Sequence, residues 1–397
     1  MIQPETKKFI EEHLSDNPHA LALQAKRYPQ VDMPTAIAQI AGRQAALKKL
    51  PTWAACSEIL YPPHLSMEQC SSEQTARYKA EIIQTPHSTY HSLTDLTGGF
   101  GIDCACLSTL FKEVTYVERQ EILCQLAAHN FPLLGLKHIT IRNSDAIDHL
   151  QQMRTADWIF IDPARRNTQG AKTVAISDCE PNVSAIEELL LQKSQHVLVK
   201  LSPMLDLSLA LNELKYVQAA HIVSAGGECK ELLLILGKET IKEIPIYCIN
   251  LLPNQKRQCF CFTRQQEQES LCKYASSPEN YLYEPNASLL KAGAFRSLAH
   301  QYGIKKLHPN SHLYTSTRLI EDFPGRKFRI TESCGFGKKE VKQLTDGAKK
   351  ANLTIRNFPA SVSELRKRLK IEEGGEIYLF ATTLSPNEKR LIRCQKV

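Results

Sequence analysis

The sequence lacks the segments that direct a chain to a membrane or out of the cell. It has no basic stretch followed by an apolar core at its start, and no uninterrupted apolar run approaches about 20 residues. Hydrophobic residues make up 43% of the 397 positions and charged residues 23%, which are values typical of globular proteins. We therefore expect a soluble cytoplasmic protein of two or three domains, with no membrane contact.

The sequence also lacks the cysteine spacing of a zinc site. Its 13 cysteines are scattered among apolar residues, and the two C-x-C pairs, Cys104/Cys106 and Cys259/Cys261, have no second pair at zinc-site distance. In a chain of this size without an export signal, disulfides are not expected either. We predict reduced core thiols and no metal.

Positive charge is concentrated near the C-terminus. The net charge is +7, yet residues 326–397 hold 17 Lys and Arg against 8 Asp and Glu, which leaves −2 for the 325 residues before them. Such asymmetry is typical of a protein that binds a polyanion. A solubilising lysine surface explains it equally well, so charge alone leaves both interpretations open.

The apolar pattern divides the chain into four segments. Residues 1–84 show helical spacing and no strand signal, and residues 85–245 alternate strands with helices, which predicts an α/β fold with a mostly parallel sheet. The last two strands of that segment are joined only by Gly226-Gly227 and a residue or so, so they must form an antiparallel hairpin. Residues 246–325 read as a linker and a small α+β, ferredoxin-like segment, and residues 326–397 as a basic α+β domain.

A glycine-rich turn, Leu93 to Asp103 ("LTDLTGGFGID"), follows the first strand of the alternating segment. Such a turn before a helix lets a ligand approach the backbone closely. A dinucleotide fingerprint would need a third glycine where Cys104 stands and would not ordinarily put Asp95 before the loop. No Gly-Lys-Ser/Thr follows, which also excludes a P-loop.

The stretch from Asp95 to Gly101 resembles motif I of the class I S-adenosylmethionine-dependent methyltransferases. The predicted seven-stranded sheet with its terminal hairpin resembles their Rossmann-like fold over about residues 85–238. This resemblance implies S-adenosylmethionine as cofactor. Glu118, which ends the next strand, matches the carboxylate on the ribose hydroxyls, and Asp145 matches the residue that accepts from the adenine amine.

The cofactor needs close backbone approach, a carboxylate for its ribose and acceptors for its amino groups. Each acidic residue has an ordinary alternative as a loop or helix-capping residue, but all of them stand at the carboxyl ends of parallel strands, where such sheets bind ligands. The predicted cofactor residues are Asp95, Thr97, Gly98, Gly99, Phe100, Gly101, Asp103, Glu118, Arg119, Asp145 and Ala146.

The run "WIFIDPARRN" ends the fourth strand and resembles motif IV of methyltransferases that act on amines and nucleic acids. Ala164 and Arg165 replace the usual second proline and aromatic residue, so stacking on an adenine-type base is in doubt. Enzymes that methylate uridine at C5 also carry an arginine here but need a cysteine where this chain has Leu201. We therefore predict an amine or oxygen acceptor, with catalytic candidates Asp162, Pro163, Arg165 and Lys200.

Two stretches flank the alternating segment, "LSMEQCSSEQTARYKAEII" at 65–83 and "YEPNASLLKAG" at 283–293. They resemble stretches in a bacterial group of methyltransferases with a THUMP-like C-terminal domain, a module found on RNA-modifying enzymes. The resemblance implies an RNA substrate. The predicted contacts are Arg166, Ser202, Lys338, Lys339, Arg366 and Arg368. For Arg165 and Arg166 the alternative is a pair with Glu180 or Asp178, and for the C-terminal lysines and arginines it is a solvated helix face. Other hypotheses are a protein or small-molecule methyltransferase and a nucleic-acid-binding protein that no longer catalyses.

Overall fold

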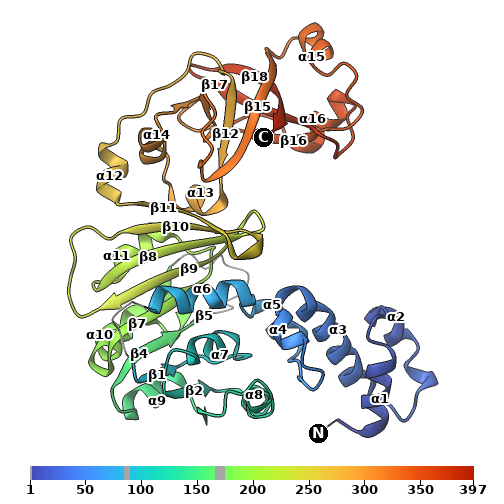
Figure 1. Ribbon diagram of the computed structural model, residues 1–397, viewed down its shortest axis with the longest axis vertical. Helices are drawn as coiled ribbons and strands as arrows, with labels where there is room; N and C mark the ends of the chain where they lie inside the picture. The colour runs from blue at the N-terminus through green and yellow to red at the C-terminus, as the bar shows by residue number, and fades with distance from the viewer. Residues whose placement is uncertain (1, 85–89, 166–174) are drawn as a thin grey trace. The chain divides into compact units, whose positions relative to one another are not determined.

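The computed structural model describes residues 2–84, 90–165 and 175–397 (Figure 1). The described chain forms two compact units. Unit 1 comprises Met1–Gln218 and Leu233–Ile241, and unit 2 comprises Ala219–Leu232 and Lys242–Val397.

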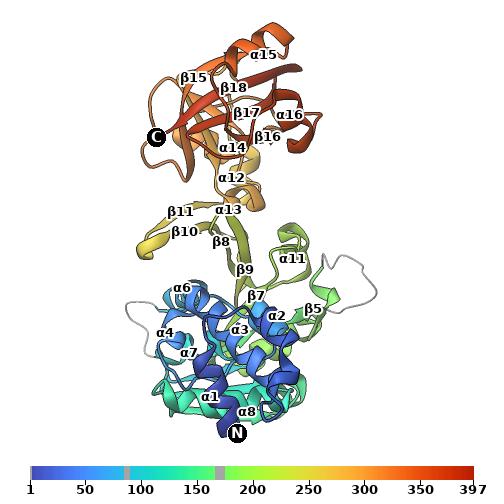
Figure 2. The ribbon, with the colours of Figure 1, turned by 90° about the vertical axis from the view of Figure 1, so that its right-hand side faces the viewer.

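The first part of unit 1 is helical, as predicted, and residues 2–84 contain no strand. Prolines stand in the first turn of the first four α-helices, where a missing N–H costs nothing. Asn17, Asp32 and Ser72 cap helices with their side chains. Phe9, from the first helix, belongs to a small core that holds the first three α-helices together. Figure 2 shows these three helices in blue. The helices are α1 (Pro4–Glu12), α2 (Pro18–Leu23), η1 (Ala25–Arg27), α3 (Met33–Lys49), α4 (Pro51–Ala54), α5 (His64–Gln69) and α6 (Glu73–Ile83).

A parallel sheet forms the second part of unit 1. Its strands are β1 (Ser92–Asp95), β2 (Glu113–Glu118), β3 (Ile139–Asn143), β4 (Ala156–Ile161) and β7 (Ser194–Leu201), in the order β3-β2-β1-β4-β7. Between and after them run α7 (Ile102–Ser108), α8 (Glu121–Leu133), α9 (Ala146–Gln152), α10 (Val183–Lys193) and α11 (Leu207–Glu213), with the short elements β5 (Ala164–Arg165), η2 (Ile176–Asp178) and β6 (Cys179–Glu180). The alternation predicted from the sequence is confirmed, and it brings the carboxyl ends of β1, β2, β4 and β7 to one edge.

The predicted hairpin is also confirmed. Strands β8 (Val217–Ala225) and β9 (Glu228–Gly237) are neighbours in the sheet and are joined by Gly226 and Gly227 at φ +62° and +85°. Two consecutive residues with positive φ suit a two-residue hairpin turn, so glycine is needed at both positions.

The sheet is larger than the seven strands expected. Strands β10 (Ile246–Leu251), parallel to β8, and β11 (Arg257–Phe262), antiparallel to β10, extend the order to β11-β10-β8-β9-β7-β4-β1-β2-β3. The sequence shows both strands but not that they join this sheet, because pairing partners are a tertiary property.

The cysteine prediction is only partly correct. All 13 cysteines are free, as expected, but Cys259 and Cys261 are exposed on β11 and only five others are fully buried. The exposed pair alternates with the buried Phe260 and Phe262, because successive side chains of a strand point to opposite faces.

Unit 2 contains a seven-stranded sheet in the order β13-β14-β12-β15-β18-β17-β16. The strands are β12 (Tyr281–Pro285), β13 (Lys305–Lys306), β14 (Tyr314–Ser316), β15 (Gly325–Cys334), β16 (Asn352–Arg356), β17 (Ile377–Leu384) and β18 (Glu388–Lys396). The helices are α12 (Arg264–Glu269), α13 (Ala287–Ala292), α14 (Arg296–Tyr302), α15 (Lys338–Leu344) and α16 (Val362–Leu369), with η3 (Pro253–Gln255). Gly293, at φ +77°, ends α13 and separates it from α14.

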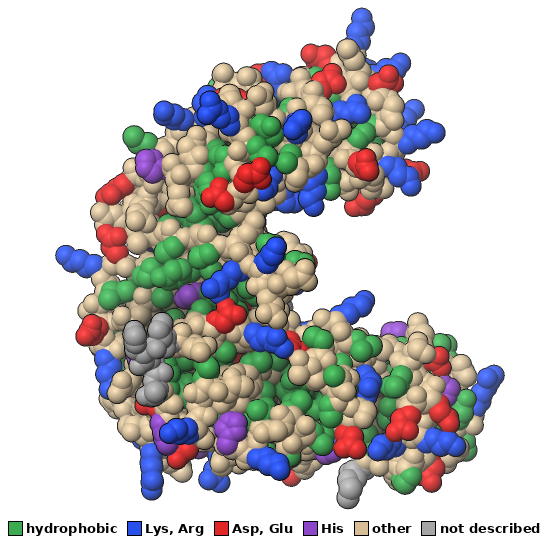
Figure 3. Space-filling model, viewed as in Figure 1, with side chains coloured by type: hydrophobic (Ala, Val, Ile, Leu, Met, Phe, Trp, Pro, Cys, Tyr) green, Lys and Arg blue, Asp and Glu red, His purple; other side chains and the backbone are tan. Residues whose placement is uncertain are grey.

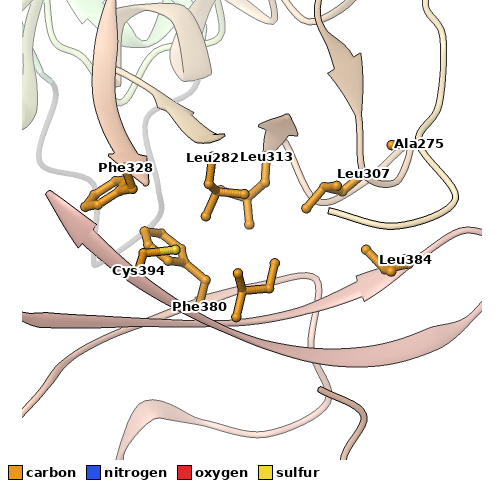
Figure 4. Packing of buried hydrophobic residues seen from close by; sticks show 9 residues of the cluster. Ala275, Leu282, Leu307, Leu313, Phe328, Phe380, Leu384 and Cys394 are labelled. Carbon is orange, nitrogen blue, oxygen red and sulfur yellow. The ribbon is translucent and has the colours of Figure 1, made fainter. Parts of the chain in front are cut away.

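The two faces of this sheet have separate apolar cores. One core contains Leu282, Phe328 and Phe380 from three strands (Figure 4), and the other contains Leu344 of α15 and Leu365 of α16 against β17 and β18. Strands β17 and β18 therefore contribute side chains to both cores.

We predict that Leu282→Ala lowers the free energy of unfolding of unit 2 by about 2–5 kcal/mol, because the side chain is fully buried and its removal leaves a cavity. Urea unfolding measures the change. The matched control is Leu271→Ala, whose side chain is 76% exposed and should cost less than about 0.5 kcal/mol. Equal losses for the two variants would contradict the packing described.

Candidate active site

The candidate site lies at the carboxyl edge of the parallel sheet in unit 1. Asp95 ends β1 and Glu118 ends β2, Asp162 follows β4, and Lys200 is the penultimate residue of β7. Because β1 stands between β2 and β4 in the sheet, the structure brings these four predicted residues to adjacent strand ends.

Each glycine of the turn meets a physical requirement. Gly99 and Gly101 have φ values of +56° and +90°, a region that other residues rarely adopt. At Gly98 a Cβ atom would come within 2.1 Å of the Tyr116 ring, whose hydroxyl donates to the Gly99 carbonyl at 2.6 Å. The turn therefore keeps its backbone close to β2 and bare of side chains on that side.

The Asp95 side chain is fully buried and only half satisfied. Its Oδ1 accepts a hydrogen bond from the Thr97 N–H at 3.0 Å, whereas Oδ2 has no hydrogen-bond partner among the described residues. Burial raises the pKa of this carboxyl well above its ordinary value, and the negative charges of Asp103, Asp162 and Glu118 raise it further. A buried carboxylate oxygen without a donor can bind a cationic or hydrogen-bonding group of a ligand.

Glu118 links the turn to the second strand. Its Oε2 accepts from the Gly99 N–H at 2.9 Å, and its Oε1 accepts from the Gln120 N–H at 2.8 Å. The side chain is nearly buried, and each carboxylate oxygen can accept one further hydrogen bond. Glu118 thus shapes the turn and still offers acceptors on its open side.

Asp145 and Arg119 have structural partners. Asp145 is exposed and caps α9, accepting from the N–H groups of Ile147 at 2.8 Å and Asp148 at 3.4 Å, which matches the capping alternative stated for it. Ala146 is the first residue of that helix. The Arg119 guanidinium donates to Glu180 at 3.2 Å.

Phe100 and Thr97 also have clear roles in the fold. The Phe100 ring is buried with its centroid 5.0 Å from that of Trp53, so its side chain packs on the N-terminal helices. The Thr97 hydroxyl accepts from the Asp162 N–H at 2.6 Å and so ties the ends of β1 and β4 together.

A chain of paired charges, most of them buried, runs beside these residues. The Lys200 ammonium donates to Asp162 Oδ2 at 2.5 Å and lies 3.5 Å from Asp103 Oδ2. The Lys79 ammonium, on α6, lies 3.1 Å from Asp103 Oδ1, and the Ser71 hydroxyl donates to Asp103 Oδ2 at 2.7 Å. Burial raises the pKa of Asp103, but the two ammonium groups and the Ser71 hydroxyl outweigh it and hold the pKa below its ordinary value.

Sequence reasoning missed Lys79 and Ser71. Lys79 is fully buried and stands on the face of α6 that also buries Thr75, Ala76 and Ile83. A lysine in the middle of an apolar helix face is the signal that identifies it, because a buried ammonium requires an anionic partner.

The other predicted residues near the site follow the ends of β4 and β7. Pro163 is buried, Arg165 belongs to the short strand β5, which pairs with β6, and Ser202 follows β7 and accepts from the Met204 N–H at 3.3 Å. Arg166 lies outside the described residues.

The predicted RNA contacts of unit 2 differ in their surroundings. Lys338 and Lys339 are exposed at the start of α15. Arg366 is half-buried and donates to the Ala351 carbonyl at 3.2 Å, and the guanidinium of the exposed Arg368 lies 4.9 Å from the Phe336 ring centroid. On the face seen in Figure 3, Lys and Arg side chains of unit 2 are interspersed with Asp and Glu.

One solved structure matches the whole chain. It is a candidate methyltransferase from Porphyromonas gingivalis W83, 36% identical, with a TM-score of 0.87 and coverage of 100% of both chains. The chain belongs to the class I S-adenosylmethionine-dependent methyltransferases. The bacterial group of methyltransferases with a THUMP-like C-terminal domain is its family, and methyl transfer is its activity.

Two family models match unit 2 of this methyltransferase. A ferredoxin-like domain covers residues 281–324 and a THUMP domain-like module covers residues 325–396. No curated protein matches the chain. Among the described residues, no helix has the length and apolar character needed to cross a membrane.

Other solved structures share less with the chain. A protein from Listeria monocytogenes, described as a class I S-adenosylmethionine-dependent methyltransferase, is 12% identical to this chain. The match covers 62% of this chain and 93% of that protein, with a TM-score of 0.38. An rRNA methylase from Streptococcus thermophilus is 17% identical over 41% of this chain and 93% of its own, with a TM-score of 0.29. Similarities this low carry no argument about substrate.

We predict that Asp95→Asn makes the empty methyltransferase more stable relative to wild type as the pH rises. The pKa of Asp95 is higher in the folded state than in the unfolded state, so the folded protein keeps this proton to a higher pH. The free energy of unfolding of the wild type therefore decreases as the pH rises from the unfolded-state pKa to the folded-state pKa, whereas asparagine has no proton to lose. Urea unfolding at several pH values measures the difference.

Asp157→Asn provides a control of opposite sign. Burial raises the pKa of Asp157, but hydrogen bonds from the backbone N–H groups of Ser92 and His91 hold it below its ordinary value, so this carboxylate adds stability as the pH rises. If both variants showed the same pH trend, the buried environment assigned to Asp95 would be incorrect.

Proposed function

We propose that this methyltransferase modifies RNA, transferring the methyl group directly to an amine or a hydroxyl oxygen without a cysteine nucleophile. The observation that carries the proposal is the THUMP domain-like match over residues 325–396, in the same chain as a methyltransferase site. The +9 charge of residues 326–397 supports it, because phosphate attraction supplies most non-specific affinity for nucleic acids.

The cofactor fits the residues present. The unpartnered Asp95 Oδ2 suits the ammonium of the methionine moiety, the glycine turn leaves room for close backbone approach, and Glu118 has acceptors for the ribose hydroxyls. We assign Asp145 to the adenine amine as well as to its helix cap. When bound, S-adenosylmethionine supplies an activated methyl group, so positioning of the acceptor can provide most of the catalysis.

The acceptor end of the site is formed by the ends of β4 and β7. We assign Asp162 to orient the acceptor, with Lys200 beside it, and the backbone around Pro163 to shape the approach. Leu201 is buried at the position where C5-uridine enzymes have their cysteine, which supports direct transfer. Arg165 and Ser202 are assigned to the RNA near the site.

We propose that four segments of the chain have separate functions. Residues 1–84 border the site, residues 85–245 catalyse, residues 246–325 connect, and residues 326–397 bind RNA with Lys338, Lys339, Arg366 and Arg368. Arg366 and Arg368 are the weaker contacts, because a backbone carbonyl and an aromatic ring already engage their guanidinium groups.

Labelled methyl transfer tests the substrate directly. Total RNA, DNA and protein from cells that lack the enzyme are each incubated with the purified protein and methyl-labelled S-adenosylmethionine. We expect label in RNA. Label confined to protein or to DNA would contradict the RNA assignment.

We predict that the double change Lys338→Gln and Lys339→Gln weakens RNA binding and lowers the slope of log affinity against log salt by about 2, because each lost phosphate contact removes about one unit. Fluorescence anisotropy over a range of salt concentrations measures the slope. Lys8→Gln, on the exposed surface of α1, is the control. An unchanged slope in the double variant would show that α15 does not contact the RNA.

A further inference from the structure

The carboxylate assigned to orient the acceptor is already paired with a cation. Lys200 donates to Asp162 Oδ2, and the Asp162 side chain is 35% exposed while that of Lys200 is 11% exposed. A substrate group that reaches the open side of Asp162 therefore lies beside a shielded positive charge.

The Lys200 charge is fixed in this place. On its other side lies Asp103, which is itself held by the buried Lys79 ammonium and the Ser71 hydroxyl. Because Asp103 and Asp162 attract the same ammonium from two sides, Lys200 is pre-organised and does not need to move during the reaction.

A fixed cation distinguishes between the two classes of acceptor. Positive charge develops on an amine nitrogen as it bonds to the methyl carbon, and a nearby ammonium opposes that change. A hydroxyl oxygen instead gains negative character as it loses its proton, which the ammonium favours. A hydroxyl also needs a proton acceptor, and Asp162 has a carboxylate oxygen, Oδ1, in addition to the one that Lys200 engages.

We propose that the acceptor is a hydroxyl oxygen and, given the RNA substrate of the proposed function on which this inference rests, the ribose 2′-hydroxyl. Internal nucleotides of RNA carry no other free sugar hydroxyl. The oxygen lone pair forms the bond to the methyl carbon while the C–S bond breaks and its electrons pass to sulfur. Asp162 accepts the hydroxyl proton, and Lys200 stays protonated and stabilises the oxygen.

Alkaline hydrolysis of the labelled RNA tests this acceptor. A 2′-O-methyl group blocks alkaline cleavage of the adjacent phosphodiester, so we expect label in alkali-resistant dinucleotides. Label released in mononucleotides would overturn the hydroxyl assignment and leave the RNA function standing. Absence of label from RNA would overturn the proposed function itself, and this inference with it.

Lys200→Met tests the cation. We expect its transfer rate to fall at least about 100-fold, the loss typical of removing one group that stabilises transition-state charge. Calorimetry should show cofactor affinity within about twofold of wild type, which separates this loss from a failure to fold or to bind cofactor. A rate within tenfold of wild type in a variant that binds cofactor normally would overturn the role of Lys200.

Lys215→Met is the matched control. Lys215 is an exposed lysine of the same unit that pairs with Glu188 at 3.6 Å, and its loss should leave the rate and the cofactor affinity unchanged. If Lys200→Met did not fold, the hydrolysis pattern of RNA labelled by the wild-type protein would still decide between the two acceptor classes.

Discussion

The Asp103 carboxylate is the contact on which the arrangement of the site depends. It lies between the ammonium groups of Lys79 and Lys200, and so joins the N-terminal helices to the end of β7. Buried charges are costly unless they are paired, and removing one partner from such a group leaves another uncompensated. This requirement ties α6 of the N-terminal helices to the candidate site through Lys79.

The surroundings of the glycine turn have the opposite character. Around the glycine turn, burial and neighbouring carboxylates act against the ionised form of Asp95, and its Oδ2 is left without a donor among the described residues. The protein thus keeps an unfavourable group where a ligand ammonium would relieve it. The free-energy cost of burying this carboxyl is offset by the well-packed strands around it.

Sequence reasoning predicted those features that depend on local pattern. The strand and helix alternation, the two-glycine hairpin and the strand-end positions of Asp95, Glu118 and Asp162 follow from periodicity and turn chemistry, and the structure has all of them. The joining of β10 and β11 to the first sheet was not predicted, because sheet pairing depends on contacts distant in sequence.

Contacts between residues distant in sequence were not predicted within the site either. The pairing of Asp103 with Lys79 joins residues 24 positions apart, on two different helices, and no motif marks it. Sequence analysis placed Asp103 among the cofactor residues because it lies in the glycine turn, whereas the structure shows its carboxylate engaged by two lysines. The roles of the individual site residues stay predictions, since they concern a ligand.

Calorimetry of S-adenosylmethionine binding in buffers of different ionisation enthalpy tests the central claim most directly. If the ligand ammonium pairs with a carboxyl whose pKa burial has raised, binding lowers the pKa of Asp95. At a pH where this carboxyl still holds its proton in the free protein, binding then releases the proton, and the measured enthalpy varies with the buffer. The account predicts this release for the wild-type protein and its loss in Asp95→Asn. The same buffer dependence in both proteins, or no binding to the wild type, would contradict it.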